Sequence, residues 1–95
     1  MRTACYEETG PASRVLRIIE TADPAPGDGE VLVRVIASGV NPSDVKKRAG
    51  WMTGPAAFPR IIPHSDGAGV IAAVGAGVDP ARVDERVWLW NAQWG

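Results

Sequence analysis

Short stretches of alternating hydrophobic and polar residues run along the chain, separated by clusters of Gly, Pro and Asp. This pattern is typical of a mainly β domain, because side chains on a strand project alternately to its two faces. We expect the first two strands to pair as a hairpin through a turn at Thr9–Pro11. The expected strands are Arg2–Glu7, Val15–Ile19, Glu30–Ser38, Gly67–Val74 and Arg86–Trp90.

The segment Glu30–Ser38 has the strongest strand pattern in the chain. Its residues Val31, Val33, Val35 and Ala37 share one face, and Arg34, the single charge after Glu30, lies on the other. We therefore expect this strand to be buried on one face and mixed on the other.

One short helix is expected, over Pro42–Gly50. Asn41 is a suitable N-cap, and proline is favoured at the first helical position. Asp44 complements the positive helix end, and Gly50 can close the helix in the left-handed conformation. The Pro- and Gly-containing segments Asp23–Gly29 and Trp51–Pro63 are expected to be loops.

Small residues dominate the stretch Gly67-Ala-Gly69 at the start of a strand. Glycines there allow another backbone to approach closely. A dinucleotide-binding glycine motif would need a following helix, whereas Val70–Val74 has a strand pattern and Pro80 blocks a long helix. A packing role is therefore the better interpretation.

Length and charge narrow the range of partners. The 95 residues make one domain at most, and 10 basic residues against 11 acidic ones leave a net charge of −1. There is no basic stripe for nucleic acid. The longest apolar runs, such as Val70–Val74, are too short to span a bilayer, and the N-terminus has no leader-like apolar segment. We expect a cytoplasmic chain without a nucleic-acid or membrane partner.

Cys5 is the single cysteine, so an internal disulfide and a multi-thiolate zinc lobe are excluded. Its place in an alternating apolar stretch favours a small buried side chain on a strand over a reactive thiol.

Polar residues gather at two places. His64, Ser65 and Asp66 follow the proline-rich loop, and Asn41 and Asp44 lie at a strand-to-helix junction. One histidine with scattered carboxylates is a poor metal-ligand set. Helix capping is a structural alternative for Asn41 and Asp44. An exposed turn, or an ion pair with a basic residue such as Arg48, is the alternative for Asp66.

Trp88 and Trp90 are two positions apart on an expected strand and therefore project from the same face, with Trp94 following near the chain end. Core packing and an exposed aromatic surface both remain open for this pair.

At this point several motifs can be compared with a known family. The chain resembles the N-terminal, GroES-like part of medium-chain dehydrogenases/reductases, and among them the zinc-independent quinone oxidoreductases of the zeta-crystallin type. The resemblance implies a partial GroES-like β-barrel over residues 1–95, with the Rossmann nucleotide-binding domain outside this chain. It rests on Gly39-Val-Asn-Pro-Ser-Asp44, Arg48-Ala-Gly50, Pro63-His-Ser-Asp-Gly-Ala-Gly-Val-Ile71 and Ala73-Val-Gly-Ala-Gly-Val78.

The resemblance also bears on metal binding. In the zinc-dependent alcohol dehydrogenase branch, a zinc-binding cysteine corresponds to Asn41, and the histidine and glutamate of a Gly-His-Glu motif correspond to Ser65 and Asp66. His64 corresponds to the glycine of that motif. The resemblance therefore implies that no zinc is bound.

The activity that the resemblance implies is hydride transfer from NADPH to a quinone, an enone or a related electron-poor carbonyl. Asn41 and Asp66 are then the candidate catalytic residues, and Asn41 and Pro42 lie next to the cofactor. The candidate substrate-binding residues are Asn41, Lys46, Ser65 and Trp90. Two positions depart from the zeta-crystallin pattern: Lys46 replaces a tyrosine, and Asp84-Glu85 replaces a Gly-Asp turn.

Three further expectations follow. The chain alone is not expected to turn over NADPH, because no strand, Gly-rich turn and helix unit is present. Unpaired strand edges or the Trp88/Trp90 surface are expected to cause self-association. The alternative function is a stand-alone β-barrel module for binding or assembly, without catalysis.

Overall fold

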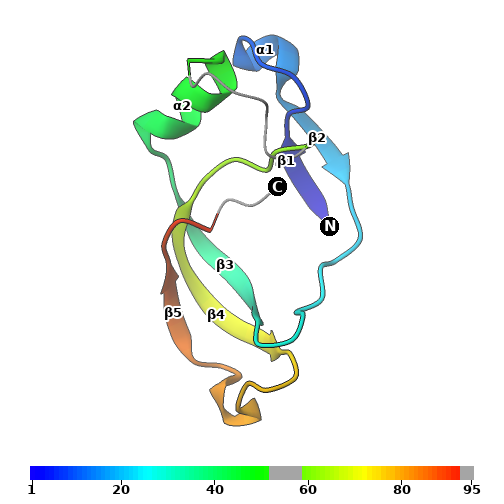
Figure 1. Cartoon of the computed structure of the whole chain (residues 1–95), viewed down its shortest axis with the longest axis vertical. Helices are drawn as coiled ribbons and strands as arrows, with labels where there is room; N and C mark the ends of the chain where they lie inside the picture. Colours follow the sequence, from blue (N-terminus) through cyan, green and yellow to red (C-terminus); the bar gives the residue numbers. More distant parts are fainter. Residues whose placement is uncertain (52–58, 93–95) are drawn as a thin grey trace.

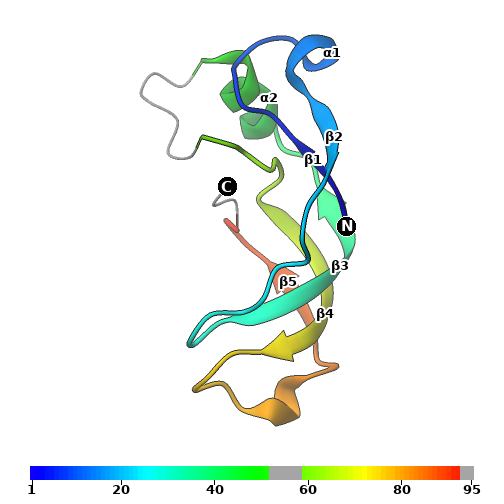
Figure 2. The ribbon, with the colours of Figure 1, turned by 90° about the vertical axis from the view of Figure 1, so that its right-hand side faces the viewer.

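The computed structural model describes residues 1–51 and 59–92. Two small antiparallel sheets dominate the fold, with helices at the ends of the long axis (Figures 1 and 2). Within the described residues the sheets do not close into a barrel. The strands are β1 (Arg2–Cys5), β2 (Arg17–Glu20), β3 (Val31–Gly39), β4 (Asp66–Val74) and β5 (Arg86–Leu89). The helices are α1 (Ala12–Val15), α2 (Pro42–Ala49) and the 3₁₀ helix η1 (Pro80–Arg82).

The first sheet confirms the expected N-terminal strand pair, with Arg2 opposite Glu20 and Cys5 opposite Arg17. The expected bounds of the second strand were wrong at its start. Val15 ends α1 and is buried, with 1% of its surface exposed. Pro11 provides the extended residue before α1, and the helical turn moves Val15 into the core, so the strand begins at Arg17.

The second sheet has the order β3-β4-β5. The expectation of one buried face on β3 was wrong, because Val35 and Ile36 are 51% and 67% exposed. Register shifts between Leu32 and Val33 and between Val35 and Ala37 interrupt the alternation of faces. In the described part of the chain, the outer half of β3 is therefore left uncovered.

The glycines of β4 have the packing role that the sequence predicts. A Cβ atom on Gly67 would lie 2.6 Å from the Ala37 carbonyl oxygen. One on Gly69 would collide with the Arg34 carbonyl oxygen and lie 2.8 Å from Val33 Cγ1. Close backbone contact between β3 and β4 thus requires glycine at both positions.

Helix α2 confirms the expected helix at both ends. Asn41 has extended N-cap dihedrals, Pro42 is the first helical residue, and Gly50 closes the helix with φ 86°. The expectation of a single helix was incomplete, because α1 and η1 add two short turns. Pro80 starts η1, where the Asp79 carboxylate accepts the Ala81 N–H at 2.9 Å.

The core is small and lies where the first sheet, α1 and β4 provide apolar side chains. Cys5 is 2% exposed, which confirms its interpretation as a buried residue on a strand. Tyr6 continues from β1 into an antiparallel bridge with Ile61. The other buried hydrophobic residues are Val15 and Ile71.

Two sequence expectations fall outside the described residues, namely the middle of the Trp51–Pro63 loop and the position of Trp94. In the ranges 1–51 and 59–92, no helix is both long and apolar enough to traverse a bilayer.

Candidate functional site

A continuous series of hydrogen bonds joins the end of β3, the first turn of α2, the start of β4 and the residues after β5. These four segments meet near the middle of the molecule, below α2 in Figure 1. The participating residues are Ser38, His64, Asp44, Asn41, Asp66 and Asn91. We refer to these six residues as the polar cluster.

The central contact of the polar cluster is between Asn41 and Asp66. Asn41 Nδ2 donates to Asp66 Oδ2 at 2.6 Å, and the backbone N–H of Asn91 approaches Asp66 Oδ1 at 3.4 Å. The suggested ion pair between Asp66 and Arg48 was wrong. Arg48 Nη1 instead donates to the Gly10 carbonyl oxygen at 2.8 Å, because α2 directs this side chain toward the N-terminal segment.

Asp44 is the buried member of the polar cluster, with 6% of its surface exposed. Its Oδ2 accepts the backbone N–H of Asn41 at 2.8 Å, and its Oδ1 accepts that of His64 at 3.3 Å. The capping interpretation is therefore correct for Asp44. It is incomplete for Asn41, whose side-chain amide extends to Asp66 across the junction.

His64 has an unusual backbone for a residue with a side chain, with φ 79°. This is the left-handed region that favours glycine, and it fits the glycine to which His64 corresponds in the zinc-branch motif. The imidazole Nδ1 lies 2.6 Å from Ser38 Oγ. The geometry thus makes His64 part of the cluster through both its backbone and its ring.

The other predicted site residues belong to several elements of the fold. Ser65 precedes Asp66, and its carbonyl oxygen accepts the Ala92 N–H at 2.9 Å. Pro42 begins α2 and is exposed, and Trp90 follows β5 and is 86% exposed. Lys46 is exposed on α2, and within the described residues its ammonium group makes no ion pair or hydrogen bond.

Sequence reasoning missed two members of the cluster, Ser38 and Asn91. Ser38 was assigned to a strand face, and its contact with His64 spans 26 positions. Asn91 contributes its backbone N–H. Every residue except proline has this group, so the residue type gives no indication of the contact. The correspondence of His64 to a glycine was the available hint that this turn has an unusual backbone.

Electrostatics connect the cluster to the core through Tyr6. Burial raises the pKa of the Tyr6 hydroxyl above its usual value, and the negative charge of Asp44 raises it further. The positive charge of Arg48 opposes the increase in this pKa. The pKa of Tyr6 therefore depends on the charge of Asp44, the buried member of the polar cluster.

The residues at the three zinc-branch positions do not fit a zinc ion. Asn41 uses its amide as a donor to Asp66, and neither Asn41 nor Ser65 supplies the thiolate or imidazole that zinc prefers. Among the described residues, no group of three or more His, Cys, Asp or Glu side chains could hold a metal.

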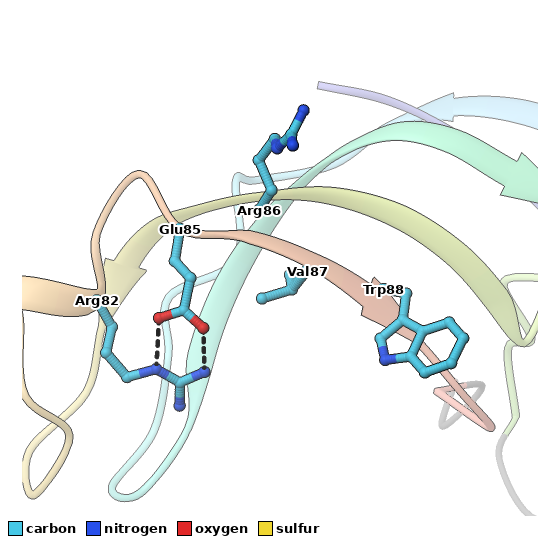
Figure 3. A pocket seen from close by; sticks show the side chains of 5 residues that line it. All are labelled: Arg82, Glu85, Arg86, Val87 and Trp88. Atoms are coloured by element: carbon cyan, nitrogen blue, oxygen red, sulfur yellow. Dashed lines mark hydrogen bonds and ion pairs between the residues drawn. The ribbon is translucent and has the colours of Figure 1, made fainter.

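A surface depression of about 540 Å³ lies along β5 and the turn before it (Figure 3). None of its lining residues belongs to the polar cluster. Arg82 donates to both carboxylate oxygens of Glu85 at 3.1 and 3.0 Å, which raises the pKa of Arg82 and lowers that of Glu85. The lining residues are Arg82, Glu85, Arg86, Val87 and Trp88.

The comparisons with known proteins agree on one family. Residues 27–94 match the family model described as the alcohol dehydrogenase GroES-like domain. A quinone oxidoreductase of Rattus norvegicus is 40% identical over 68 residues, covering 72% of this chain and 20% of the rat protein.

Solved structures agree in fold. A mycobacterial protein in complex with NADPH superposes with a TM-score of 0.83 at 33% identity, covering 98% of this chain and 28% of that one. A cobalt- and zinc-bound alcohol dehydrogenase from Pyrobaculum aerophilum gives a TM-score of 0.78 at 38% identity, covering 93% and 26%. The chain spans 27% of the length of an alcohol dehydrogenase of Moraxella sp. and 16% of that of a synaptic vesicle membrane protein VAT-1 homolog of Mus musculus.

Proposed function

This chain belongs to the family of alcohol dehydrogenase GroES-like domains, and from that premise we propose that it forms the substrate side of an NADPH-dependent reductase of quinones or enones. In this proposal residues 1–95 are the N-terminal domain, and a Rossmann domain elsewhere in the complete protein binds the nucleotide. The contact between Asn41 and Asp66 is the observation that carries the proposal.

Asn41 has the chemistry that a carbonyl acceptor requires. A side-chain amide carries two N–H donors, and one of them is held by Asp66. Within the described residues the second makes no hydrogen bond, so it can donate to a quinone or enone oxygen. A donor fixed in this way stabilises the negative charge that develops on the oxygen during reduction.

Asp66 acts in this proposal by orienting Asn41. Its carboxylate accepts the Asn41 amide with Oδ2, so the amide cannot rotate freely. Its Oδ1 faces the backbone N–H of Asn91. Fixing the donor before the substrate binds reduces the entropy lost in reaching the reactive geometry.

Asn41 and Pro42 are the residues of this chain that would lie beside the nicotinamide, because hydride transfer requires the nicotinamide to lie against the acceptor that Asn41 binds. When bound, NADPH supplies the hydride. Ser65, Lys46 and Trp90 would border the acceptor, with exposed Lys46 and Trp90 offering a cation and an aromatic surface.

The chain alone is proposed to be inactive, since it would hold one side of the active site. A first experiment titrates the isotope-labelled chain with tetramethyl-benzoquinone, whose ring has neither a free C–H position nor a leaving group for a thiol, and follows the amide resonances of the chain. Shifts centred on Asn41 and Asp66, and their loss in Asn41→Ala but not in Asp28→Ala, are expected. Asp28 is a suitable control because it is an exposed residue in a distant loop.

A second experiment measures activity. Residues 1–95 replace the matching quarter of a quinone oxidoreductase, and quinone-dependent oxidation of NADPH is recorded. The proposal expects activity in this chimera and a fall of 10-fold or more in kcat/KM, roughly the loss of one charge-stabilising donor, in Asn41→Ala. A folded chimera that binds NADPH but does not reduce quinones or enones overturns the proposal.

We further infer that the isolated chain self-associates through an exposed strand edge or the Trp88/Trp90 surface. This inference concerns the chain itself and is independent of the chemistry of the complete enzyme.

A further inference from the structure

His64, a member of the polar cluster, has a backbone conformation that its residue type disfavours. Its φ of 79° lies in the left-handed region, which costs a residue with a side chain more than it costs glycine. Conformations of this kind persist where the surrounding structure holds them, and they gather at functional sites. A glycine would adopt this turn without strain, so the contacts of the His64 side chain have to offset the cost.

Two contacts hold His64 in this conformation, one to its imidazole and one to its backbone. The imidazole Nδ1 lies 2.6 Å from Ser38 Oγ on β3. The backbone N–H of His64 donates to Asp44 Oδ1 at 3.3 Å. A serine hydroxyl can both donate and accept, so the first contact forms with either tautomer of the imidazole. The left-handed turn is therefore fixed from two sides, by β3 and by α2.

Asp44 connects this turn to Asn41. Its two carboxylate oxygens accept two backbone N–H groups, that of His64 on Oδ1 and that of Asn41 on Oδ2 at 2.8 Å. Asp44 is only 6% exposed, so these hydrogen bonds form where water competes least. Because one planar carboxylate joins the two N–H groups, a shift of the His64 peptide changes how Asp44 holds the N-cap of α2.

The contacts form a closed cycle of hydrogen bonds around the junction between β3 and α2. The cycle closes because Asp66, which accepts the Asn41 amide, is the register partner of Gly39 on β3. Hydrogen bonds in a connected network support one another, so the loss of one contact weakens the others. The side chains of the cycle are those of Ser38, His64, Asp44, Asn41 and Asp66.

We propose that His64 and Ser38 are positioning residues for the reduction, because their contact holds the turn before β4 and thereby fixes the Asn41 amide. The link to catalysis rests on the proposed function, whereas the positioning of Asn41 is a property of the chain itself. Neither His64 nor Ser38 has to touch the acceptor or exchange a proton with it. A donor that is fixed before the acceptor binds loses less entropy in reaching the reactive geometry.

Variants of His64 separate its contact with Ser38 from the chemistry of the imidazole. His64→Gly removes the contact and keeps the left-handed turn without strain, so the chain should remain folded. His64→Asn keeps the contact, because Oδ1 of asparagine is attached to Cγ as Nδ1 of histidine is. Asparagine also tolerates the left-handed region.

Variants of serine remove the contact from its other side. Ser38→Ala deletes the hydroxyl at an exposed position of β3, so the sheet should be preserved. Ser13→Ala makes the same chemical change at an exposed position of α1, outside the polar cluster, and is the matched control. Circular dichroism spectra that match the parent chain are expected for every variant.

The first test uses the isotope-labelled chain without substrate. Nuclear magnetic resonance measures how fast the Asn41 side-chain amide protons exchange with solvent. We expect His64→Gly and Ser38→Ala each to speed this exchange about 2- to 10-fold, the range that one hydrogen bond spans. His64→Asn and Ser13→Ala should leave the rate unchanged.

A double variant shows whether one contact accounts for both effects. Ser38→Ala combined with His64→Gly should exchange no faster than either single variant, because both remove the same hydrogen bond. Equal exchange rates in the parent chain, His64→Gly and Ser38→Ala overturn the positioning role, whatever the complete protein reduces.

The second test measures quinone reduction by the chimera described above. We expect kcat to fall about 2- to 10-fold in His64→Gly and Ser38→Ala, with the KM for NADPH unchanged, and to be restored in His64→Asn. A kcat that is unchanged in His64→Gly, or that falls equally in His64→Asn, overturns the proposal. An inactive parent chimera overturns the proposed function instead, and the exchange rates still decide the positioning role.

Discussion

Asn41 donates its side-chain amide to the Asp66 carboxylate across 2.6 Å, although 25 positions separate the two residues in the chain. The contact joins the β3–α2 junction to the first residue of β4. It lies between positions that correspond to metal ligands in the zinc-dependent branch of the family. In this chain an amide–carboxylate hydrogen bond connects the two segments.

Replacing Asn41 by aspartate should reverse the sign of this interaction. Asn41→Asp would place two carboxylates in contact, and we expect a loss of about 1–3 kcal/mol in the free energy of unfolding at neutral pH. The raised pKa of the pair means that stability is present below the usual carboxylate pKa of about 4 and lost as the pH rises through the folded value. Urea denaturation at pH 3 and pH 7, which lie about one and about three pH units from that pKa, measures this difference.

The matched control exchanges the two side chains. The double variant Asn41→Asp with Asp66→Asn restores one amide and one carboxylate, so most of the lost stability should return. If the double variant is as unstable as the sum of its single variants, the contact contributes nothing specific to stability.

Asp84 provides a test of backbone strain. Its φ of 75° and its bonds with Ile71 give the geometry of a β-bulge in which glycine is favoured at the first position. Asp84→Gly should therefore stabilise the chain by about 0.5–1 kcal/mol, because the left-handed conformation costs an L-residue about 1–2 kcal/mol and the extra chain entropy of glycine offsets only part of that gain. Ala76→Gly, at an exposed residue without a positive φ, should destabilise it instead; thermal unfolding distinguishes the two.

Gly69 provides a test of close strand packing. A methyl group there would collide with the Arg34 carbonyl oxygen and approach Val33 Cγ1, so β3 and β4 would have to separate. We expect Gly69→Ala to lower the free energy of unfolding by about 1–3 kcal/mol. Ala68→Ser, at the exposed neighbouring position, should change it by less than about 0.5 kcal/mol; denaturant midpoints at constant m-value give both values.

Tyr6 is the only tyrosine in the chain, which makes its titration directly measurable by ultraviolet absorbance. Its pKa is raised above 10.0 by burial and by Asp44. A raised folded-state pKa contributes stability that is fully present below pH 10 and is lost as the pH rises through the folded value.

The chain should therefore lose stability in alkali, and Tyr6→Phe should reduce that loss. Asp44→Asn should lower the pKa of Tyr6 by removing the nearby negative charge. A titration of Tyr6 that does not change in Asp44→Asn would contradict the proximity of the two groups.

Elements controlled by local chemistry were predictable from the sequence. The bounds of α2 follow from the Asn41 cap, Pro42 and Gly50, which act within one or two turns of the chain. The glycines of β4 were assigned to packing because a residue without a side chain allows another backbone to approach closely. Cys5 was placed correctly because its neighbours alternate in a short apolar strand.

Elements controlled by distant contacts were predicted less well. Val15 lies in α1 rather than in the expected strand, because the helical turn places its side chain in the core. The exposed face of β3 follows from bulges and from the absence of cover in the described part of the chain, neither of which its alternation reveals.

The sequence by itself determined the family, the β class and the side-chain types at Asn41 and Ser65, because these depend on which residues are present and on short spacings. The tertiary structure alone decided that Asn41 bonds to Asp66 rather than Asp66 to Arg48, and that Ser38 and Asn91 join them. Hydrogen bonds form between groups that folding brings within about 3 Å. Residues 25 positions apart can meet in many ways, and the pairing of β3 with β4 selects one of them.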